Sequence, residues 1–360
     1  MGIGISSTGL ALPETVRGND FWSPETVDGW RSMFEMQSDE EFAEIDASHQ
    51  RQFSEGLRER QELFDPFNGA KERRIADPNT VSSDLEVLAA TKAIEAAPKG
   101  TGDFDALICS TAVPDKMAVT NASKVHDLLS LPRKCLSFNL DAAANSFLHQ
   151  LEVSRSLISS GRCRRVLTIQ SSLMSRLANI ERPWGTWHGD GATAAIVEDV
   201  GDGHGILGAA HYTDGRYYDA AFATTDGGSW FDTGRVTWRL GDRQVARALM
   251  FNVTEFARSS VSEALREAGL SVDEVAFFGL HQGTAWMQEE CQRAVGLSHA
   301  KTMHNYSWTG SLSSADVPLM YHLSREQGLL RDGEAAVFFS GGSGITYSST
   351  VLRAGTRLAS

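Results

Sequence analysis

The stretch Phe138–Leu148, FNLDAAANSFL, decides the fold. Its first residues are the apolar end of a strand, and the apolar spacing after Asp141 predicts a helix that ends at Gly161. Asp141 is a good N-cap, and the alanines that follow it favour a helix. A strand that turns through small residues into a helix N-terminus lets a ligand approach the backbone and directs free N–H groups at it. That geometry suits a nucleophile and an oxyanion, although Ala144 at the turn is neither nucleophile nor base.

Strands and helices alternate on both sides of this stretch. The apolar spacing predicts strands at 3–12, 106–110, 135–140, 164–171, 193–197, 275–280, 335–339 and 349–352, and helices at 85–97, 121–129, 141–160 and 245–269, with a further helix closing at 321–328. Such alternation is typical of an α/β protein with helices on the faces of a partly parallel sheet. The charged segment 19–65 predicts two or three additional helices, which either cover a pocket or pack on the surface.

Length and composition limit the classes of function. The chain has 360 residues, of which 41% are hydrophobic and 22% charged, and this length is enough for a large core. Its net charge of −13 makes nucleic acid and anionic membranes poor partners. The start lacks a basic segment before an apolar run, no run has the length of a transmembrane helix, and the four cysteines show no CxxC spacing. We therefore expect a cytoplasmic protein with free, buried thiols.

Several motifs, in order along the chain, resemble the β-ketoacyl-ACP synthase III (KAS III) family of the thiolase superfamily. Phe138–Leu148 resembles the family's nucleophile segment, roughly F-D-L-x-A-A-C-S-G-F. Gly9–Glu14 (GLALPE), Lys71–Ile75 (KERRI) and Trp187–Glu198 (WHGDGATAAIVE) resemble the family's G-x-x-L-P-E, K-E-R-x-I and F-G-D-G-A-x-A-A-V-L-E segments. The resemblance covers about residues 1–18 and 66–353.

The resemblance implies the thiolase fold, in which two similar βαβαβ-type halves form a five-layered αβαβα core. Here the halves would be residues 1–200, with the insertion at about 19–65, and residues 201–360. The repeat is one of element order, since no repeat is found at residue level. Members of the family form dimers through this core, which implies a homodimer.

The resemblance also assigns three catalytic positions. The family's cysteine falls on Ala144, its histidine is His281 in GLHQGT, and its asparagine falls on Ser311. In the family the histidine hydrogen-bonds the thioester carbonyl, and with the asparagine it stabilises the enolate left by malonyl decarboxylation. Losing one such donor costs on the order of 3 kcal/mol of transition-state stabilisation, so Ser311 disfavours decarboxylation. Asn305 is a candidate substitute for the asparagine, and Asp316 is a candidate to orient His281.

The resemblance implies that the substrate is an acyl thioester of CoA or of an acyl carrier protein. It also implies which residues contact this thioester. The backbone N–H groups of Ala144 and Ser343 are the expected oxyanion hole, with Ser343 in the glycine-rich run SGGSGITY. The residue that caps the partner subunit's acyl pocket falls on Ala118, or on its neighbours Met117 and Val119. A small residue at 118 suits a long or bulky acyl group.

Arg243 and Arg247 lie where the family has basic residues that receive CoA or the carrier protein, although solvated helix charges are an equal alternative. The Gly-Asp-Gly at 189–191 is a turn into a strand rather than a phosphate loop, because no helix or lysine follows it. His188 is then a turn residue rather than a ligand. The ten histidines show no HxxxH or HExxH arrangement, so we expect neither a metal site nor a tightly bound cofactor.

Three functions stay open. The first is a KAS III-like condensing enzyme that joins an acyl group from a CoA or ACP thioester to a β-ketoacyl or related carbon acceptor, in fatty acid, polyketide or secondary-metabolite biosynthesis. In this case Ala144 stands in for a removed cysteine. The second is a non-decarboxylating acyltransferase that makes an ester or amide, with His281 as general base. The third is a catalytically inactive subunit that pairs with an active homologue.

Overall fold

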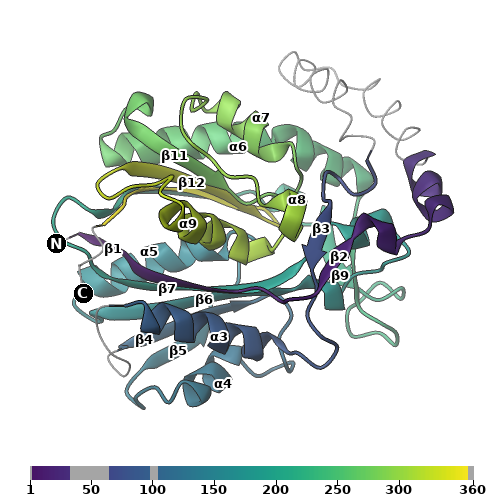
Figure 1. The fold of residues 1–360 in the computed structure, drawn as a ribbon, viewed down its shortest axis with the longest axis horizontal. Helices are drawn as coiled ribbons and strands as arrows, with labels where there is room; N and C mark the ends of the chain where they lie inside the picture. The colour runs from purple at the N-terminus through teal and green to yellow at the C-terminus, as the bar shows by residue number, and fades with distance from the viewer. Residues whose placement is uncertain (1, 33–64, 98–103, 356–360) are drawn as a thin grey trace.

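The computed structural model describes residues 2–32, 65–97 and 104–355. Two β-sheets face each other, with helices between them and on their outer faces (Figure 1). The first sheet, of order β1-β7-β6-β4-β5, contains β1 (Ile3–Ala11), β4 (Ala106–Thr111), β5 (Leu136–Asn139), β6 (Arg165–Leu173) and β7 (Asp190–Asp199). The second sheet, of order β11-β12-β13-β8, contains β8 (Gly205–Thr213), β11 (Val275–Leu280), β12 (Ala335–Gly342) and β13 (Thr346–Arg353).

Helices form three layers around these sheets. α5 (Ser146–Ser159) and α9 (Asp316–Glu326) lie between the sheets (Figure 1). The outer helices are α3 (Ser82–Glu95) and α4 (Asn121–Leu128) on the five-stranded sheet, and α6 (Arg243–Ala268) and α7 (Met287–Ala294) on the four-stranded sheet. The layers therefore follow the order helix, sheet, helix, sheet, helix, and the predicted αβαβα core is confirmed.

The central strands are apolar on both faces because helices cover both sides of each sheet. In β12, Ala336 and Phe338 pack in the core between the sheets, whereas Val337 and Phe339 pack in the core that contains α6. Successive side chains of a strand point to opposite faces, so each central strand divides its apolar residues between two cores. This division explains why these strands appear in the sequence as continuous apolar runs.

Two short strand pairs and one short helix complete the elements near the candidate site. β2 (Val16–Gly18) pairs antiparallel with β3 (Glu72–Arg74), and β9 (Ala221–Thr224) pairs antiparallel with β10 (Thr237–Leu240). The helix α8 (Tyr306–Thr309) precedes α9. Sequence periodicity does not predict β8, β9 or β10, since these stretches lack a clear apolar alternation.

The helix after the turn starts later than predicted. α5 begins at Ser146, so the prediction of Asp141 as its N-cap is wrong. The Asp141 carboxylate instead accepts a hydrogen bond from the backbone N–H of Thr111, 3.0 Å away. Ala143 has a φ of 50°, which lies outside the right-handed helical region. Tertiary contacts here override the helix propensity of the alanines.

The predicted insertion falls mainly on residues 33–64, which lie outside the described residues. Its described start packs on the body of the protein, because Trp22 and Trp30 are buried against Phe67. Their indole N–H groups donate to the backbone carbonyl oxygens of Ile180 and Glu181, at 2.9 and 3.2 Å.

Candidate active site

The turn between β5 and α5 is held by side-chain hydrogen bonds. The Ser146 hydroxyl accepts from the backbone N–H of Ala142 (2.8 Å) and donates to the carbonyl oxygen of Ala143 (2.7 Å). Ala144 is 6% exposed, and its carbonyl oxygen accepts from the Ser340 hydroxyl at 2.8 Å. The position of the family's cysteine is therefore a buried methyl group, on a firmly held backbone just before α5.

The end of β12 lies directly against this turn. A Cβ added to Gly342 would lie 2.0 Å from the carbonyl oxygen of Ala142, so only glycine permits the contact. Ser343 follows immediately and is exposed. The turn and the glycine-rich segment thus approach closely, as two backbone donors of one oxyanion hole must. The role of the Ala144 and Ser343 N–H groups stays a prediction.

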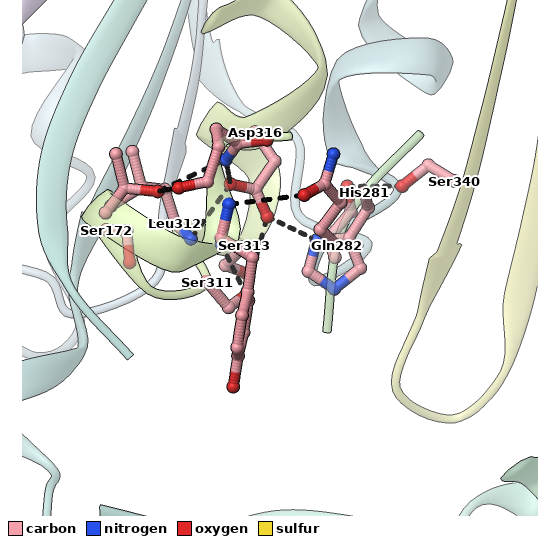
Figure 2. Close-up of polar contacts among 12 residues, drawn as sticks. Ser172, His281, Gln282, Ser311, Leu312, Ser313, Asp316 and Ser340 are labelled. Carbon is pink, nitrogen blue, oxygen red and sulfur yellow. Dashed lines mark hydrogen bonds and ion pairs between the residues drawn. The ribbon is translucent and has the colours of Figure 1, made fainter. Parts of the chain in front are cut away.

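His281 and Asp316 form a close pair at the carboxyl end of β11 (Figure 2). His281 follows that strand, and Asp316 is the first residue of α9. The His281 Nδ1 lies 2.7 Å from Asp316 Oδ2; the Asp316 side chain is fully buried and that of His281 is 14% exposed. A carboxylate only accepts hydrogen bonds, so Nδ1 is the donor in this contact, and in the neutral form of the ring Nε2 keeps its lone pair. This is the arrangement of a histidine general base oriented by an aspartate.

The Asp316 carboxylate is fixed by further donors (Figure 2). Its Oδ1 accepts from Asn305 Nδ2 at 3.0 Å and from the backbone N–H of Leu312 at 3.1 Å. Asn305 is fully buried, and its amide N–H group is used by Asp316. A place for Asn305 in the substrate pocket stays a prediction, whereas its contact with Asp316 makes it part of the support of the His281–Asp316 pair.

Ser311, at the position of the family's asparagine, has hydrogen-bond partners within the chain. Its hydroxyl donates toward Asp316 Oδ2 at 3.4 Å and accepts from the backbone N–H of Ser313 at 3.3 Å. Its backbone N–H donates to the carbonyl oxygen of Trp187 at 2.8 Å, and its carbonyl accepts from the N–H of Gly189 at 3.1 Å. A catalytic role for Ser311 stays a prediction, and its hydroxyl is turned toward Asp316 in this structure.

His188 lies beside Ser311, although sequence reasoning treats it only as a turn residue. Residues 188 and 311 form a parallel β-bridge, and neither ring nitrogen of His188 has a hydrogen-bond partner among the described residues. The imidazole meets the ring of Trp238 edge-on, with 4.8 Å between centroids. Burial, and then the charge of His281, lower the pKa of His188 from 6.5 to about 4. The one signal in the sequence is that histidine stands where the motif F-G-D-G-A has phenylalanine.

The His188→Phe variant is expected to be more stable than the wild type, most of all at acidic pH. An unpaired buried polar group costs about 1–3 kcal/mol. Since the folded state lowers the pKa of His188, the unfolded chain binds more protons between pH 6.5 and about 4, and the free energy of unfolding falls as the pH falls through this range. Urea unfolding at several pH values between 6.5 and about 4 should show that the free energy of unfolding of the variant lacks this decrease. A pH dependence equal to that of the wild type would contradict a buried, neutral imidazole.

The other predicted site residues lie in the loop before α4 and in the first turns of α6. Met117 and Val119 are 64% and 59% exposed in the loop before α4, and Ala118 between them has a φ of 64°. Arg243 is exposed at the start of α6, and Arg247 is half-buried one turn later. Their proposed contacts, with a partner subunit and with CoA or the carrier protein, stay predictions.

Two features are absent from the described part of the chain: a cluster that could hold a metal ion and a helix that could cross a membrane. Among those residues, no three His, Cys, Asp or Glu side chains are grouped to hold a metal ion. None of the described helices is both long enough and apolar enough to cross a membrane. The four cysteines are free thiols; Cys135 is half-buried and the other three are buried.

Comparison with known proteins identifies the family. Two profiles of 3-oxoacyl-[acyl-carrier-protein] synthase III match the chain, one at residues 138–215 and its C-terminal counterpart at 265–354. The β-ketoacyl-[acyl-carrier-protein] synthase III of Sphingopyxis alaskensis is 31% identical over 289 residues, which cover 79% of this chain and 88% of that protein. The chain belongs to the β-ketoacyl-ACP synthase III family. The KAS III of Fusobacterium nucleatum is also 31% identical, with the same coverage of both chains.

Solved structures share the fold over nearly the whole length. The 3-oxoacyl-(acyl carrier protein) synthase III of Pseudomonas aeruginosa PAO1 has a TM-score of 0.79 and 23% identity, and the match covers 100% of both chains. OleA of Xanthomonas campestris has a TM-score of 0.76 and 17% identity, with 98% of this chain and 97% of OleA covered. The thiolase fold of the KAS III family is thereby confirmed. KAS III proteins are condensing enzymes, which are acyltransferases.

Proposed function

We propose that this KAS III chain transfers an acyl group from a CoA or carrier-protein thioester to an acceptor whose proton is removed by His281. The observation that carries the proposal is the 2.7 Å contact between His281 Nδ1 and the buried Asp316 carboxylate. An aspartate on Nδ1 orients the ring and stabilises the imidazolium that forms when Nε2 takes a proton. A hydroxyl or amine acceptor has a proton to lose and suits this pair, so the product is an ester or an amide.

In this reaction His281 Nε2 takes the acceptor's proton while the acceptor attacks the thioester carbonyl carbon. The negative charge that develops on the oxygen would be held by the N–H groups of Ala144 and Ser343. The C–S bond then breaks, and the leaving sulfur takes the proton from His281 as a free thiol. Because Ala144 offers no nucleophile, the acyl group would pass directly from donor to acceptor without an acyl-enzyme.

A condensing reaction is the second candidate, since the relatives are named β-ketoacyl-ACP synthases III. The acyl group would then join a β-ketoacyl or related carbon acceptor. That route uses a cysteine at position 144 and a donor at position 311, where this chain has alanine and an engaged serine. A third candidate, an inactive subunit paired with an active homologue, is favoured by Ala144 itself.

The donor is proposed to be an acyl thioester of CoA or of the carrier protein, received at Arg243 and Arg247 of α6. A cysteine-to-serine variant of Xanthomonas campestris OleA was solved with bound lauric acid and lauroyl-CoA, which supports CoA as the carrier here. Cytoplasmic localisation is part of the same proposal.

A homodimer is proposed for either of the two enzymatic functions. β5 is an edge strand, and Leu136 in it is 45% exposed. Met117 and Val119, in the loop that follows the neighbouring strand β4, are also exposed and apolar. An exposed apolar edge is a surface that a second copy can cover. Ala118 would then face the acyl pocket of the partner subunit.

Release of free thiol and of CO₂ tests the proposal. The chain is incubated with a panel of acyl-CoA donors and hydroxyl or amine acceptors, and separately with malonyl-thioester. We expect thiol release that depends on the hydroxyl or amine acceptor, without CO₂. Release of CO₂ from malonyl-thioester would favour condensation instead. Release of neither product, by this chain and by its Ala144→Cys variant, would favour the inactive subunit.

A further inference from the structure

His188 carries two polar atoms that the proposed reaction does not use. Both ring nitrogens are buried, and neither has a hydrogen-bond partner among the described residues. Buried polar groups in proteins are nearly always paired, and an unpaired one destabilises the fold. The two unpaired ring nitrogens of His188 therefore indicate a hydrogen-bond partner that belongs to a bound ligand and not to the chain.

The backbone places His188 on the same side as Ser311. The two residues are paired in a parallel bridge, with backbone hydrogen bonds of 2.8 and 3.1 Å on either side of it. Paired residues of neighbouring extended segments point their side chains to the same face. His188 therefore lies on the face from which the Ser311 hydroxyl reaches Asp316, the partner of His281.

The surroundings of His188 favour a neutral donor. Burial, and then repulsion by His281 when that ring is protonated, lower the pKa of His188 to about 4. Near neutral pH the ring is then uncharged, with one N–H donor and one acceptor nitrogen. Trp238 of β10 packs edge-on against the ring and restricts its movement. A neutral ring N–H can donate a hydrogen bond to a carbonyl oxygen. Because the ring carries no charge, it leaves the Asp316 carboxylate to His281.

We infer that His188 is a substrate-contacting residue whose ring N–H is a third donor to the carbonyl oxygen of the bound acyl thioester, in addition to the backbone N–H groups of Ala144 and Ser343. It adds a donor beside Ser311, whose hydroxyl is turned toward Asp316 and Ser313. His188 transfers no proton in this role, and His281 remains the base. The inference rests on the proposed acyl-thioester function and names the group that recognises its carbonyl.

Two matched ligands separate recognition of the carbonyl from binding of CoA in general. One is an acyl-CoA, and the other is an S-alkyl-CoA thioether of the same chain length, which lacks the carbonyl oxygen. Titration calorimetry measures both affinities for the wild type, for His188→Phe, and for His299→Phe as a control at an exposed histidine. We expect His188→Phe to weaken thioester binding about tenfold and to leave thioether binding unchanged. The control should change neither.

Equal weakening of both ligands, or of neither, would overturn the role of His188 and leave the acyltransferase proposal intact. Failure of the wild type to bind either ligand would overturn both. His188→Ala is a second test, because it removes the donor without adding bulk and must show the same selective loss of thioester binding. A His188→Ala protein that keeps the thioester preference of the wild type would also overturn the inference.

Discussion

The Ala144→Cys protein is expected to gain the mass of one acyl group on incubation with a matching acyl-CoA, whereas the Ala144 chain gains none. The backbone at this turn is held by the Ser340 and Ser146 hydroxyls, so the new sulfur enters without rebuilding it. The N-terminus of a helix such as α5 lowers the pKa of a thiol, and the thiolate is the nucleophile. Its attack on the thioester carbonyl expels CoA and leaves the acyl group on the protein. Intact-mass spectrometry with a panel of acyl-CoA donors would measure this gain and identify the donor.

The protein's own cysteines provide an internal control for that experiment. Burial raises the pKa of Cys109 and Cys291 well above the usual range of a thiol, and raises that of Cys135 to about 11. Such thiols are poor nucleophiles, so a mass gain maps to position 144. The matched variant Ala144→Ser, with a weaker nucleophile of similar size, should acylate far more slowly. A folded Ala144→Cys protein that gains no mass with any donor would favour the inactive subunit.

Asp316→Asn should lower kcat for acyl transfer on the order of 10²–10⁴-fold, with little change in KM. The amide keeps the size of the carboxylate but lacks the charge that stabilises the imidazolium, and its NH₂ group favours the wrong tautomer of His281. Substrate binding is kept because Asp316 contacts His281 rather than the acyl group. Steady-state kinetics of thiol release measures both constants in the Ala144 chain. If only the Ala144→Cys variant is active, both constants are measured in that background.

Asp332→Asn is the matched control for that substitution. Asp332 is a partly exposed carboxylate that pairs with Arg325, away from His281, so both kinetic constants should stay at their wild-type values. Thermal unfolding of the two variants shows whether a lower kcat reflects a damaged fold. A kcat at the wild-type level in a stable Asp316→Asn protein would contradict the role of His281 as an aspartate-oriented base.

Apolar periodicity predicts the layers because each helix and strand here is buried on defined faces. The predicted strand at 275–280 matches β11 at both ends, since its apolar run lies between charged residues and His281. The start of α5 is mispredicted because distant contacts decide it. The Asp141 carboxylate accepts a hydrogen bond from the backbone N–H of Thr111, and Gly342 of β12 packs against the turn. Helix propensity describes neither contact.

Some residues of the candidate site can be predicted from the local sequence, and others depend on contacts between distant segments. His281 is predictable, because it follows an apolar strand at the carboxyl end, where ligands bind in α/β sheets. Asp316 is only a nearby candidate in the sequence, and its contact with His281 depends on where α9 begins. The place of His188 beside Ser311 depends on a backbone pairing between distant segments, which no residue spacing reveals.

Among the described residues, the hydrogen bonds that hold the turn together do not involve the side chain of residue 144. The hydrogen bonds there join the backbone of 142–144 to the hydroxyls of Ser146 and Ser340. Alanine, serine and cysteine are therefore interchangeable at this position at little structural cost. Replacing His281 or Asp316, in contrast, leaves the other residue without its hydrogen-bond partner. One substitution at position 144 would thus add or remove the proposed acyl-enzyme chemistry, while the contact between His281 and Asp316 stays as it is.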